Sequence, residues 1–159
     1  MERCPPENAE RIVNAYADTV YRLAYAYAHK RADADDIFQD VFYRYFRKRP
    51  AFESSEHEKA WFLRVTVNCA KKRLSSAWRR RVGTLEDDIP FLTAEDSGLN
   101  EALSKLPAVD RSVIHLFYYE GYRAEEIGAL LGLNASAVRT RLTRARRKLK
   151  AYMKEEADV

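Results

Sequence analysis

The sequence has few of the residues that interrupt regular structure. Only five glycines and five prolines occur among its 159 residues. Neither residue type occurs between Glu7 and Arg49 or between Ala51 and Val82. An all-β sandwich or barrel needs turn residues about every 8–12 positions, so these two stretches exclude such a fold. The sequence therefore predicts long α-helices.

Cysteines and long apolar runs are also scarce, and each scarcity excludes a class of protein. Cys4 and Cys69 are too few and too far apart for a disulfide framework or a zinc site. No apolar run approaches the roughly 20 residues that a membrane-spanning helix needs. No apolar signal segment follows Met1. We therefore expect a cytoplasmic protein.

Charge of one sign is missing from three segments of the sequence. Residues 71–81 contain six basic residues and no acidic one, and residues 139–150 contain seven basic residues and no acidic one. Between them, residues 86–101 contain six acidic residues and no basic one. Although the net charge is only +4, this distribution predicts two contacts with a polyanion, joined by a segment that avoids it.

Apolar spacing predicts three helices in residues 1–80, which can pack as a small bundle. The first covers about 9–29, and its buried face consists of Ile12, Tyr16, Val20, Leu23 and Tyr27. Asp33 is placed to cap the second helix, which ends at Pro50. The third covers about 58–80 and buries Trp61, Val65 and Cys69.

Residues 81–98 lack sustained periodicity and contain most of the acidic segment. We interpret them as a linker between two domains. Phe91 and Leu92 are apolar residues within it, and we expect them to be contact points for a partner.

Residues 99–159 return to helical periodicity and contain a helix-turn-helix pattern. Two short helices end at Pro107 and Gly121 and precede the motif. Gly132 stands where the tight turn needs a positive φ, and Asn134 is a good N-cap for the second helix. Val138 and Leu142 fall on the inner face of that helix. The whole chain is thus expected to be all-α, with two small helical domains joined by an acidic linker.

The second helix of the motif, over about 135–154, has the pattern of a helix that enters the major groove of DNA. Arg139, Thr140, Thr143 and Arg144 face outward or flank the outer surface, and Arg and Thr side chains can contact base edges. Arg141, Arg146, Arg147 and Lys148 are placed for phosphates, which position a protein without specifying sequence. A basic helix that is merely solvated is the alternative, and the agreement of the turn, the cap and the apolar faces argues against it.

Basic residues interleaved with aromatic ones suit single-stranded or partly melted nucleic acid. The basic segment 71–81 follows Trp61, Phe62 and Asn68 on one predicted helix and contains Trp78. Trp61 on an apolar face is more often a core residue than a stacking platform, so Trp78 is the better candidate for exposure. On composition alone, Asn68 is interpreted as a solvated helix residue.

No residues support catalysis, a metal site or a cofactor. Asp33, Asp35, Asp36 and Asp40 open a helix, where the helix dipole favours acids, and they lack the spacing of metal ligands. The histidines stand in unrelated contexts, and neither a nucleophile elbow nor a glycine-rich phosphate loop is present. We expect neither an enzyme nor a small-molecule substrate.

Two sets of residues, one in each half of the chain, resemble conserved regions of the bacterial sigma factors of RNA polymerase. The resemblance is to the small extracytoplasmic-function (ECF) group of the sigma-70 family. Residues 33–42 and 61–68 resemble conserved region 2. Residues 103–107, 111–117, 126–128 and 138–146 resemble region 4. The resemblance implies a region 2 domain over 1–80, a linker over 81–98 and a region 4 domain over 99–159. It covers nearly the whole chain outside the linker.

The resemblance implies a role for each set of matching residues. Contacts to the clamp helices of the polymerase β′ subunit fall on Asp36, Gln39 and Asp40. Contacts to the −10 promoter element, including the loop that captures a flipped base, fall on Phe52, Glu53, Ser54, Asn68, Lys71 and Lys72. Reading of the −35 element falls on Arg139, Thr140, Thr143 and Arg144, and residues 117–121 would meet the β flap. An anti-sigma factor, often anchored in the inner membrane, is a further implied partner.

Two residues depart from the family pattern, and two other functions stay open. Arg123 stands where the family has a capping Ser or Thr, which removes about 1 kcal/mol of local stability. Lys72 stands where many members carry an acid. The alternatives are a stand-alone helix-turn-helix regulator and a sigma-like protein that binds polymerase without reading promoters. Binding to promoter DNA without polymerase would favour the regulator.

Overall fold

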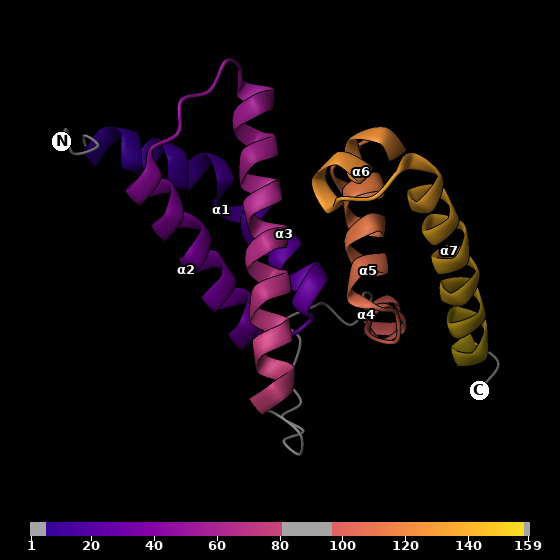
Figure 1. Ribbon diagram of the computed structural model, residues 1–159. Coiled ribbons are helices and arrows are strands. Elements are labelled where there is room, and N and C mark those ends of the chain that lie inside the picture. Colours follow the sequence, from indigo (N-terminus) through magenta and orange to yellow (C-terminus); the bar gives the residue numbers. More distant parts are fainter. Residues whose placement is uncertain (1–5, 81–96, 158–159) are drawn as a thin grey trace. The chain divides into compact units, whose positions relative to one another are not determined.

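The computed structural model describes the backbone of residues 6–80 and 97–157 and the side chains of 8–75 and 98–154. The described residues form helices, turns and bends, with no strand among them. The chain divides into two compact units, residues 1–86 and 87–159 (Figure 1). The all-α fold in two small helical domains is therefore confirmed. Phe91 and Leu92 of the expected linker lie outside the described residues.

The first unit is a bundle of three helices in which each helix packs on the other two (Figure 1). They are α1 (Pro6–Ala28), α2 (Arg31–Lys48) and α3 (Ser55–Arg80). Apolar side chains at helical spacing form the core between them, as the sequence predicts. Its buried members include Ile12, Val20, Leu23, Ile37, Val41, Phe62, Leu63 and Val67.

Phe62 is the centre of this core, rather than the neighbouring Trp61 that the sequence places on the buried side. The Phe62 ring is fully buried and stacks on Tyr16 with 4.4 Å between ring centroids. It also meets Phe42 and Tyr45, at 5.6 and 5.2 Å. Trp61 is half-buried at the edge of the cluster. Burial of a Phe side chain stabilises a fold by about 2 kcal/mol. The burial of Phe62 therefore decides which face of α3 turns toward the core.

The N-terminus of α2 differs from the prediction. Lys30 is the N-cap residue, with extended backbone, and its own side chain makes no capping hydrogen bond. Asp33 lies inside the first turn, where it is buried, and its carboxylate is 3.7 Å from Arg73 Nε of α3. The expectation that Asp33 is the N-cap residue is therefore wrong, because the helix begins at Arg31 and Asp33 lies within its first turn.

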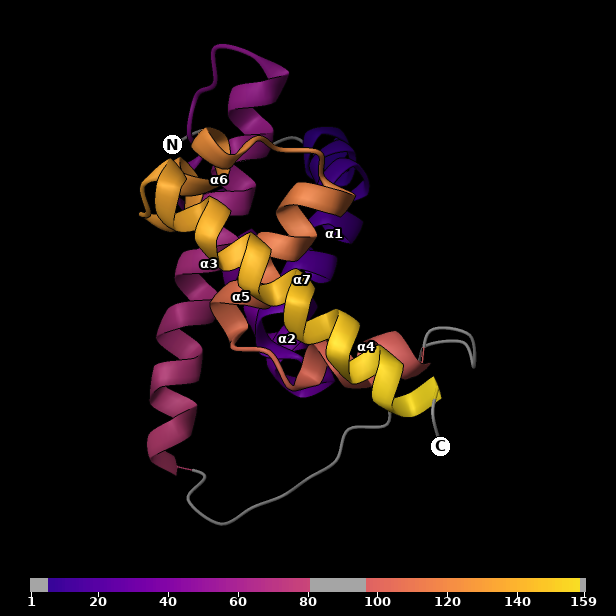
Figure 2. The same ribbon diagram turned by 90° about the vertical axis from the view of Figure 1, so that its right-hand side faces the viewer.

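The second unit packs one long helix against shorter ones (Figure 2). The short elements are α4 (Ser97–Ser104), α5 (Ala108–Ile114), the π-helical turn η1 (His115–Tyr119) and α6 (Ala124–Leu131). The long helix is α7 (Ala135–Ala157), which packs on α4, α5 and α6. Leu106, Val113, Leu116, Ile127, Val138, Leu142 and Ala145 form the buried core. The single helix that the sequence predicts before Gly121 widens into a π turn, a feature that is frequent at functional sites.

Candidate nucleic-acid interfaces

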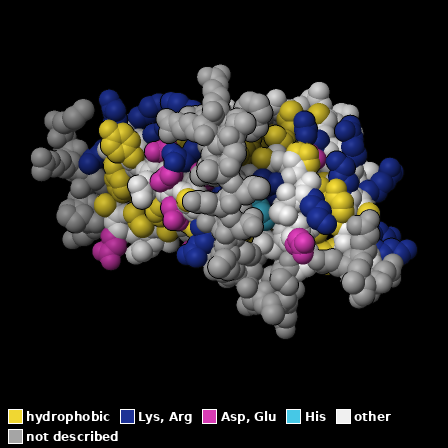
Figure 3. Space-filling model, turned by 90° about the horizontal axis from the view of Figure 1, so that it is seen from below, with side chains coloured by type: hydrophobic (Ala, Val, Ile, Leu, Met, Phe, Trp, Pro, Cys, Tyr) yellow, Lys and Arg dark blue, Asp and Glu magenta, His cyan; other side chains and the backbone are white. Residues whose placement is uncertain are grey.

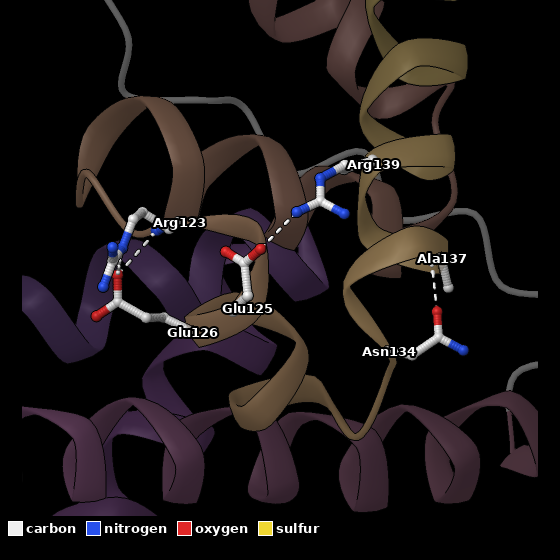
Figure 4. Close-up of polar contacts among 6 residues, drawn as sticks. All are labelled: Arg123, Glu125, Glu126, Asn134, Ala137 and Arg139. Carbon is white, nitrogen blue, oxygen red and sulfur yellow. Dashed lines mark hydrogen bonds and ion pairs between the residues drawn. The ribbon is translucent and has the colours of Figure 1, made fainter.

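The turn between α6 and α7 has the geometry that the sequence predicts. Gly132 adopts a φ of 73° and its N–H donates to the Gly128 carbonyl. The N–H of Leu133 donates to the same oxygen at 2.9 Å. Asn134 Oδ1 accepts the backbone N–H of Ala137 at 2.7 Å, which caps α7 (Figure 4). These contacts fix the direction in which α7 leaves the turn, so α6 and α7 form a helix-turn-helix.

The outer surface of α7 carries the four residues predicted to read bases. Val138, Leu142 and Ala145 are buried against the unit, as expected for the inner face. The side chains on the opposite surface are exposed, and they are Arg139, Thr140, Thr143 and Arg144. The structure thus brings these four together on one accessible stripe of a capped helix, as contact with base edges requires.

Arg139 already has a partner on the first helix of the motif. Its guanidinium donates to the Glu125 carboxylate of α6, and both side chains are largely exposed (Figure 4). Thr143 Oγ1 donates to the Arg139 carbonyl at 3.0 Å. Glu125 therefore holds the guanidinium beside the outer stripe, a contact between helices that sequence spacing does not reveal.

The residues predicted to contact phosphates do not share one environment. Arg141 is half-buried and donates to the buried Asp110 carboxylate of α5 at 2.9 Å. Arg147 and Lys148 are exposed on α7. In the space-filling view, Lys and Arg side chains gather on the visible face of the second unit (Figure 3). Arg141 thus docks α7 on α5, whereas Arg147 and Lys148 are accessible to phosphates.

An aromatic cluster around η1 engages Arg146, the remaining member of that set. Arg146 Nε donates to the Tyr118 hydroxyl, and the guanidinium carbon lies 5.4 and 5.3 Å from the ring centroids of Phe117 and Tyr118. Tyr118 and Tyr119 are 59% and 55% exposed. Residues 117–121, predicted to meet a polymerase surface, therefore present aromatic rings to solvent.

The start of α6 replaces the missing cap in another way. Glu126 accepts the backbone N–H of Arg123 at 3.0 Å and its Nε at 3.3 Å (Figure 4). The backbone hydrogen bond, more than the guanidinium, lowers the pKa of the Glu126 carboxyl. Arg123 supplies no side-chain acceptor, as expected, but Glu126 forms the returning half of a capping box.

The loop before α3 is ordered by the start of that helix. Ser54 Oγ accepts the backbone N–H of His57 at 3.1 Å, and the Glu53 N–H donates to His57 Nδ1 at 3.3 Å. The Phe52 ring meets those of His57 and Trp61 edge-on, at 5.4 and 6.0 Å between centroids. Ser54, predicted to touch the −10 element, therefore caps α3, and His57 accepts a hydrogen bond from the backbone of the residue before that cap.

Beyond this loop, α3 presents the other residues predicted to contact the −10 element. Asn68, Lys71 and Lys72 are exposed. Cys69, next to Asn68, is buried, and burial raises the pKa of its thiol. The side chain of Trp78 lies outside the described residues. The structure thus places the predicted polar residues on one accessible face of α3.

The acidic cluster on α2 is partly paired within the unit. Asp36 is half-exposed and accepts a hydrogen bond from Arg73 of α3. Gln39 and Asp40 are exposed on the same helix. Arg73 bridges Asp33 and Asp36, and no sequence signal singles it out from the surrounding basic residues. It ties the acidic surface of α2 to the helix that carries Asn68.

Neither a metal centre nor a membrane span is found among the residues that the structure describes. Within that part of the chain, His, Cys, Asp and Glu side chains do not gather in groups of three or more suited to a metal ion. None of its helices is both long and apolar enough to cross a membrane.

Comparison with known proteins places both units in one family. A family model described as Sigma-70 region 2 matches residues 12–80, and one described as Sigma-70, region 4 matches residues 98–149. The ECF RNA polymerase sigma factor SigE of Mycolicibacterium smegmatis is 33% identical over 157 residues, which are 91% of this chain and 61% of that protein. The RNA polymerase sigma factor SigV of Bacillus subtilis is 30% identical over 143 residues, covering 86% of this chain and 85% of that protein. The chain belongs to the ECF group of the sigma-70 family.

Solved structures carry the same architecture as this ECF sigma factor. CnrH, solved in complex with the cytosolic domain of CnrY, is 26% identical, with a TM-score of 0.68 over 98% of this chain and 92% of that one. The sigma factor RpoE of Bartonella quintana, solved with the anti-sigma factor NepR, is 20% identical, with a TM-score of 0.79 over 93% and 98%. The layout of region 2 and region 4 is therefore confirmed at the level of the fold. The chain spans 61% and 41% of two of its curated relatives, so these carry segments that the chain does not match.

Proposed function

We propose that this chain is the promoter-specificity subunit of an RNA polymerase. In this role it binds the core enzyme, recognises −10 and −35 promoter elements and starts transcription. The observation that carries the proposal is the pairing of a region 2 bundle with a region 4 helix-turn-helix on one chain, in the family's order. A promoter subunit performs recognition and no covalent chemistry, so the proposal does not make it an enzyme. It acts in the cytoplasm without a cofactor or a small-molecule substrate.

In this proposal the second unit reads the duplex at the −35 element. Arg139, Thr140, Thr143 and Arg144 contact base edges, because they share the exposed stripe of the capped helix α7. Arg147 and Lys148 contact phosphates, and Arg146 joins them from the aromatic cluster. Arg141 supports the interface from within through Asp110. Each phosphate neutralised on duplex DNA contributes about −0.9 to the slope of log affinity against log salt.

The first unit melts and holds the −10 element in the proposal. Phe52, Glu53 and Ser54 form the loop that captures a base, and Asn68, Lys71 and Lys72 line the neighbouring face of α3. The loop is fixed by Ser54 and His57 before DNA arrives. Unstacking a base costs a few kcal/mol, and a preformed loop avoids the further cost of ordering itself.

Polymerase and an inhibitor are the proposed protein partners. Asp36, Gln39 and Asp40 on α2 meet the β′ clamp helices, and the exposed aromatic turn at residues 117–121 meets the β flap. CnrH was solved with the cytosolic domain of CnrY, and this similarity supports an anti-sigma partner, which a membrane anchor could hold.

Transcription by purified core polymerase from a genomic DNA library tests the proposal directly. With the protein present, we expect new transcripts that start downstream of a shared pair of sequence motifs. Polymerase binding without new transcripts would favour a sigma-like protein that does not read promoters. Promoter binding without polymerase would favour a stand-alone regulator.

Two sets of variants separate the proposed surfaces. Arg144→Ala is expected to lower transcription from the native promoter while core binding is kept, and Lys150→Ala, also exposed on α7, is the matched control. Gln39→Ala or Asp40→Ala is expected to weaken core binding. Unchanged transcription with Arg144→Ala would refute the −35 assignment, and equal core affinity would reduce the acidic cluster to a helix-dipole effect.

A further inference from the structure

The contact between Glu125 and Arg139 joins the two helices of the motif on their outer side. Glu125 lies in the first turn of α6, and Arg139 lies near the start of α7, the part of such a helix that meets base edges. The guanidinium donates to the carboxylate, yet the two side chains stay 60% and 61% exposed. Figure 4 shows them pointing toward each other. A partner that approaches the outer stripe of α7 therefore meets this ion pair.

The helix dipole and the cap of α6 do not account for this contact. Acidic residues are favoured in the first turn of a helix, and both Glu125 and Glu126 lie there. Glu126 turns back and accepts the backbone N–H of Arg123 at 3.0 Å, which satisfies one N–H at the helix start. Glu125 points the other way, toward α7 (Figure 4). The dipole thus explains an acid at this position but not its contact with Arg139.

An exposed acid at this edge of the motif opposes DNA binding. In a helix-turn-helix the first helix crosses the DNA backbone, so a carboxylate at its start lies near phosphates once DNA is bound. Charges of the same sign repel, and the repulsion lowers affinity for every duplex, whatever its sequence. A benefit from Glu125 must therefore lie in the choice of sequence rather than in affinity.

The ion pair orients a side chain that is otherwise flexible. Val138 is buried and the Arg139 carbonyl accepts from Thr143 Oγ1 at 3.0 Å, so the backbone here is fixed. The arginine side chain has many rotamers, and the carboxylate selects among them. A guanidinium has five N–H donors, so one that is held by a carboxylate keeps donors for guanine O6 and N7. Without Glu125, the same group can turn to a phosphate, which carries no sequence information.

We propose that Glu125 is a specificity-determining residue of the −35 interface, which directs Arg139 to a guanine and keeps it off the phosphates. Glu125 acts through Arg139 and is a positioning residue rather than a base contact. The inference rests on the proposed function, because it requires that α7 reads the −35 element. It predicts two opposite effects: loss of the carboxylate lowers sequence discrimination and raises affinity for duplexes in general.

The test selects −35 sequences with polymerase that carries the full chain. The probe is a library of promoter duplexes with one constant −10 region and random base pairs over the −35 element. We expect the unaltered chain to prefer guanine about tenfold at the position that Arg139 reads, and Arg139→Ala to lose this preference. Glu125→Gln should lower the preference there about threefold or more and leave other positions unchanged. Glu101→Gln, which removes an exposed acid from the same unit, is the charge-matched control.

A salt titration tests whether the released guanidinium turns to a phosphate. On a duplex with a scrambled −35 element, Glu125→Gln should bind more tightly than the unaltered chain. Its slope of log affinity against log salt should steepen by about 0.9, for one added phosphate contact. When Arg139→Ala is already present, Glu125→Gln should alter the base preferences no further, because its effect on them passes through Arg139.

Three results would overturn the inference. The first is equal base preferences for Glu125→Gln and its control. The second is a change at positions that Arg139→Ala does not affect. The third is a loss of preference at every position, which would assign Glu125 to the stability of α6. If the unaltered chain selects no −35 sequence at all, it is the proposed function that fails.

Discussion

Replacing Arg141 with Ala distinguishes a docking role from a phosphate contact. Breaking a fully buried ion pair costs about 3–5 kcal/mol, and an exposed pair is worth about 0.2–1 kcal/mol. The side chains of Asp110 and Arg141 are 8% and 39% exposed, with 2.9 Å between donor and acceptor. The pair lies between these limits, so we expect Arg141→Ala to destabilise the second unit by about 2 kcal/mol. In a domain of this size, that lowers the melting temperature by about 10 °C.

The assay combines thermal unfolding with the salt dependence of DNA binding. Arg147→Ala is the matched control, because Arg147 lies on the same helix with an exposed side chain. We expect it to leave the melting temperature unchanged and to reduce the salt slope on −35 DNA by about 0.9. Arg141→Ala should do the reverse, lowering the melting temperature with little change in slope.

A double-mutant cycle with Asp110→Ala isolates the pair from the other effects of each substitution. We expect the two changes together to cost about 2 kcal/mol less than the sum of their separate costs. A melting temperature equal to that of the unaltered chain, with a slope reduced by about 0.9, would refute the reasoning and restore Arg141 as a phosphate contact.

Three further predictions concern local contacts. Gly132 has a φ of 73° with open space around it, so Gly132→Ala should lower the free energy of unfolding in urea by about 1 kcal/mol, and Gly132→Asn should lower it less. Equal stability of the unaltered chain and both variants would contradict backbone strain at this position. The pKa of Glu126 is lowered, so the stabilisation by its carboxylate is complete above the ordinary pKa of 4.5 and is lost as the pH falls through the lowered pKa. Glu126→Gln should flatten the dependence of stability on pH in this range. An unchanged dependence would argue against the capping role of Glu126. Tyr16→Phe should lose about 1–2 kcal/mol of stability in thermal unfolding, because the Tyr16 hydroxyl donates to the largely buried Glu58 carboxylate at 2.6 Å; no loss would mean that Arg11 alone satisfies Glu58.

Periodicity and turn chemistry predicted most of the fold because both act over a few residues. Gly132 and Asn134 each have the conformation or bond that local sequence requires. Periodicity did not predict which of two neighbouring aromatic residues is buried in the core. Trp61 and Phe62 both suit a buried face, and the packing of Tyr16 and Tyr45 against Phe62 decided between them.

The candidate site shows the same division. The exposed stripe of Arg139, Thr140, Thr143 and Arg144 follows from helical spacing alone. Their roles in DNA binding stay predictions, as do those of the −10 and polymerase-binding residues. The pairing of Arg139 with Glu125 and that of Arg146 with Tyr118 required the coordinates, because each joins residues at least fourteen positions apart.

The sequence by itself determined the helical class, the two domains and the helix-turn-helix, since helix length, apolar spacing and a glycine turn depend on residues that are close together in the sequence. Only the tertiary structure decided which charges remain available to a partner. Asp33, Asp36 and Arg141 look like accessible charges in the sequence, and each pairs with an opposite charge on a different helix. Long side chains reach partners that chain order does not bring near, so their availability depends on how the helices pack.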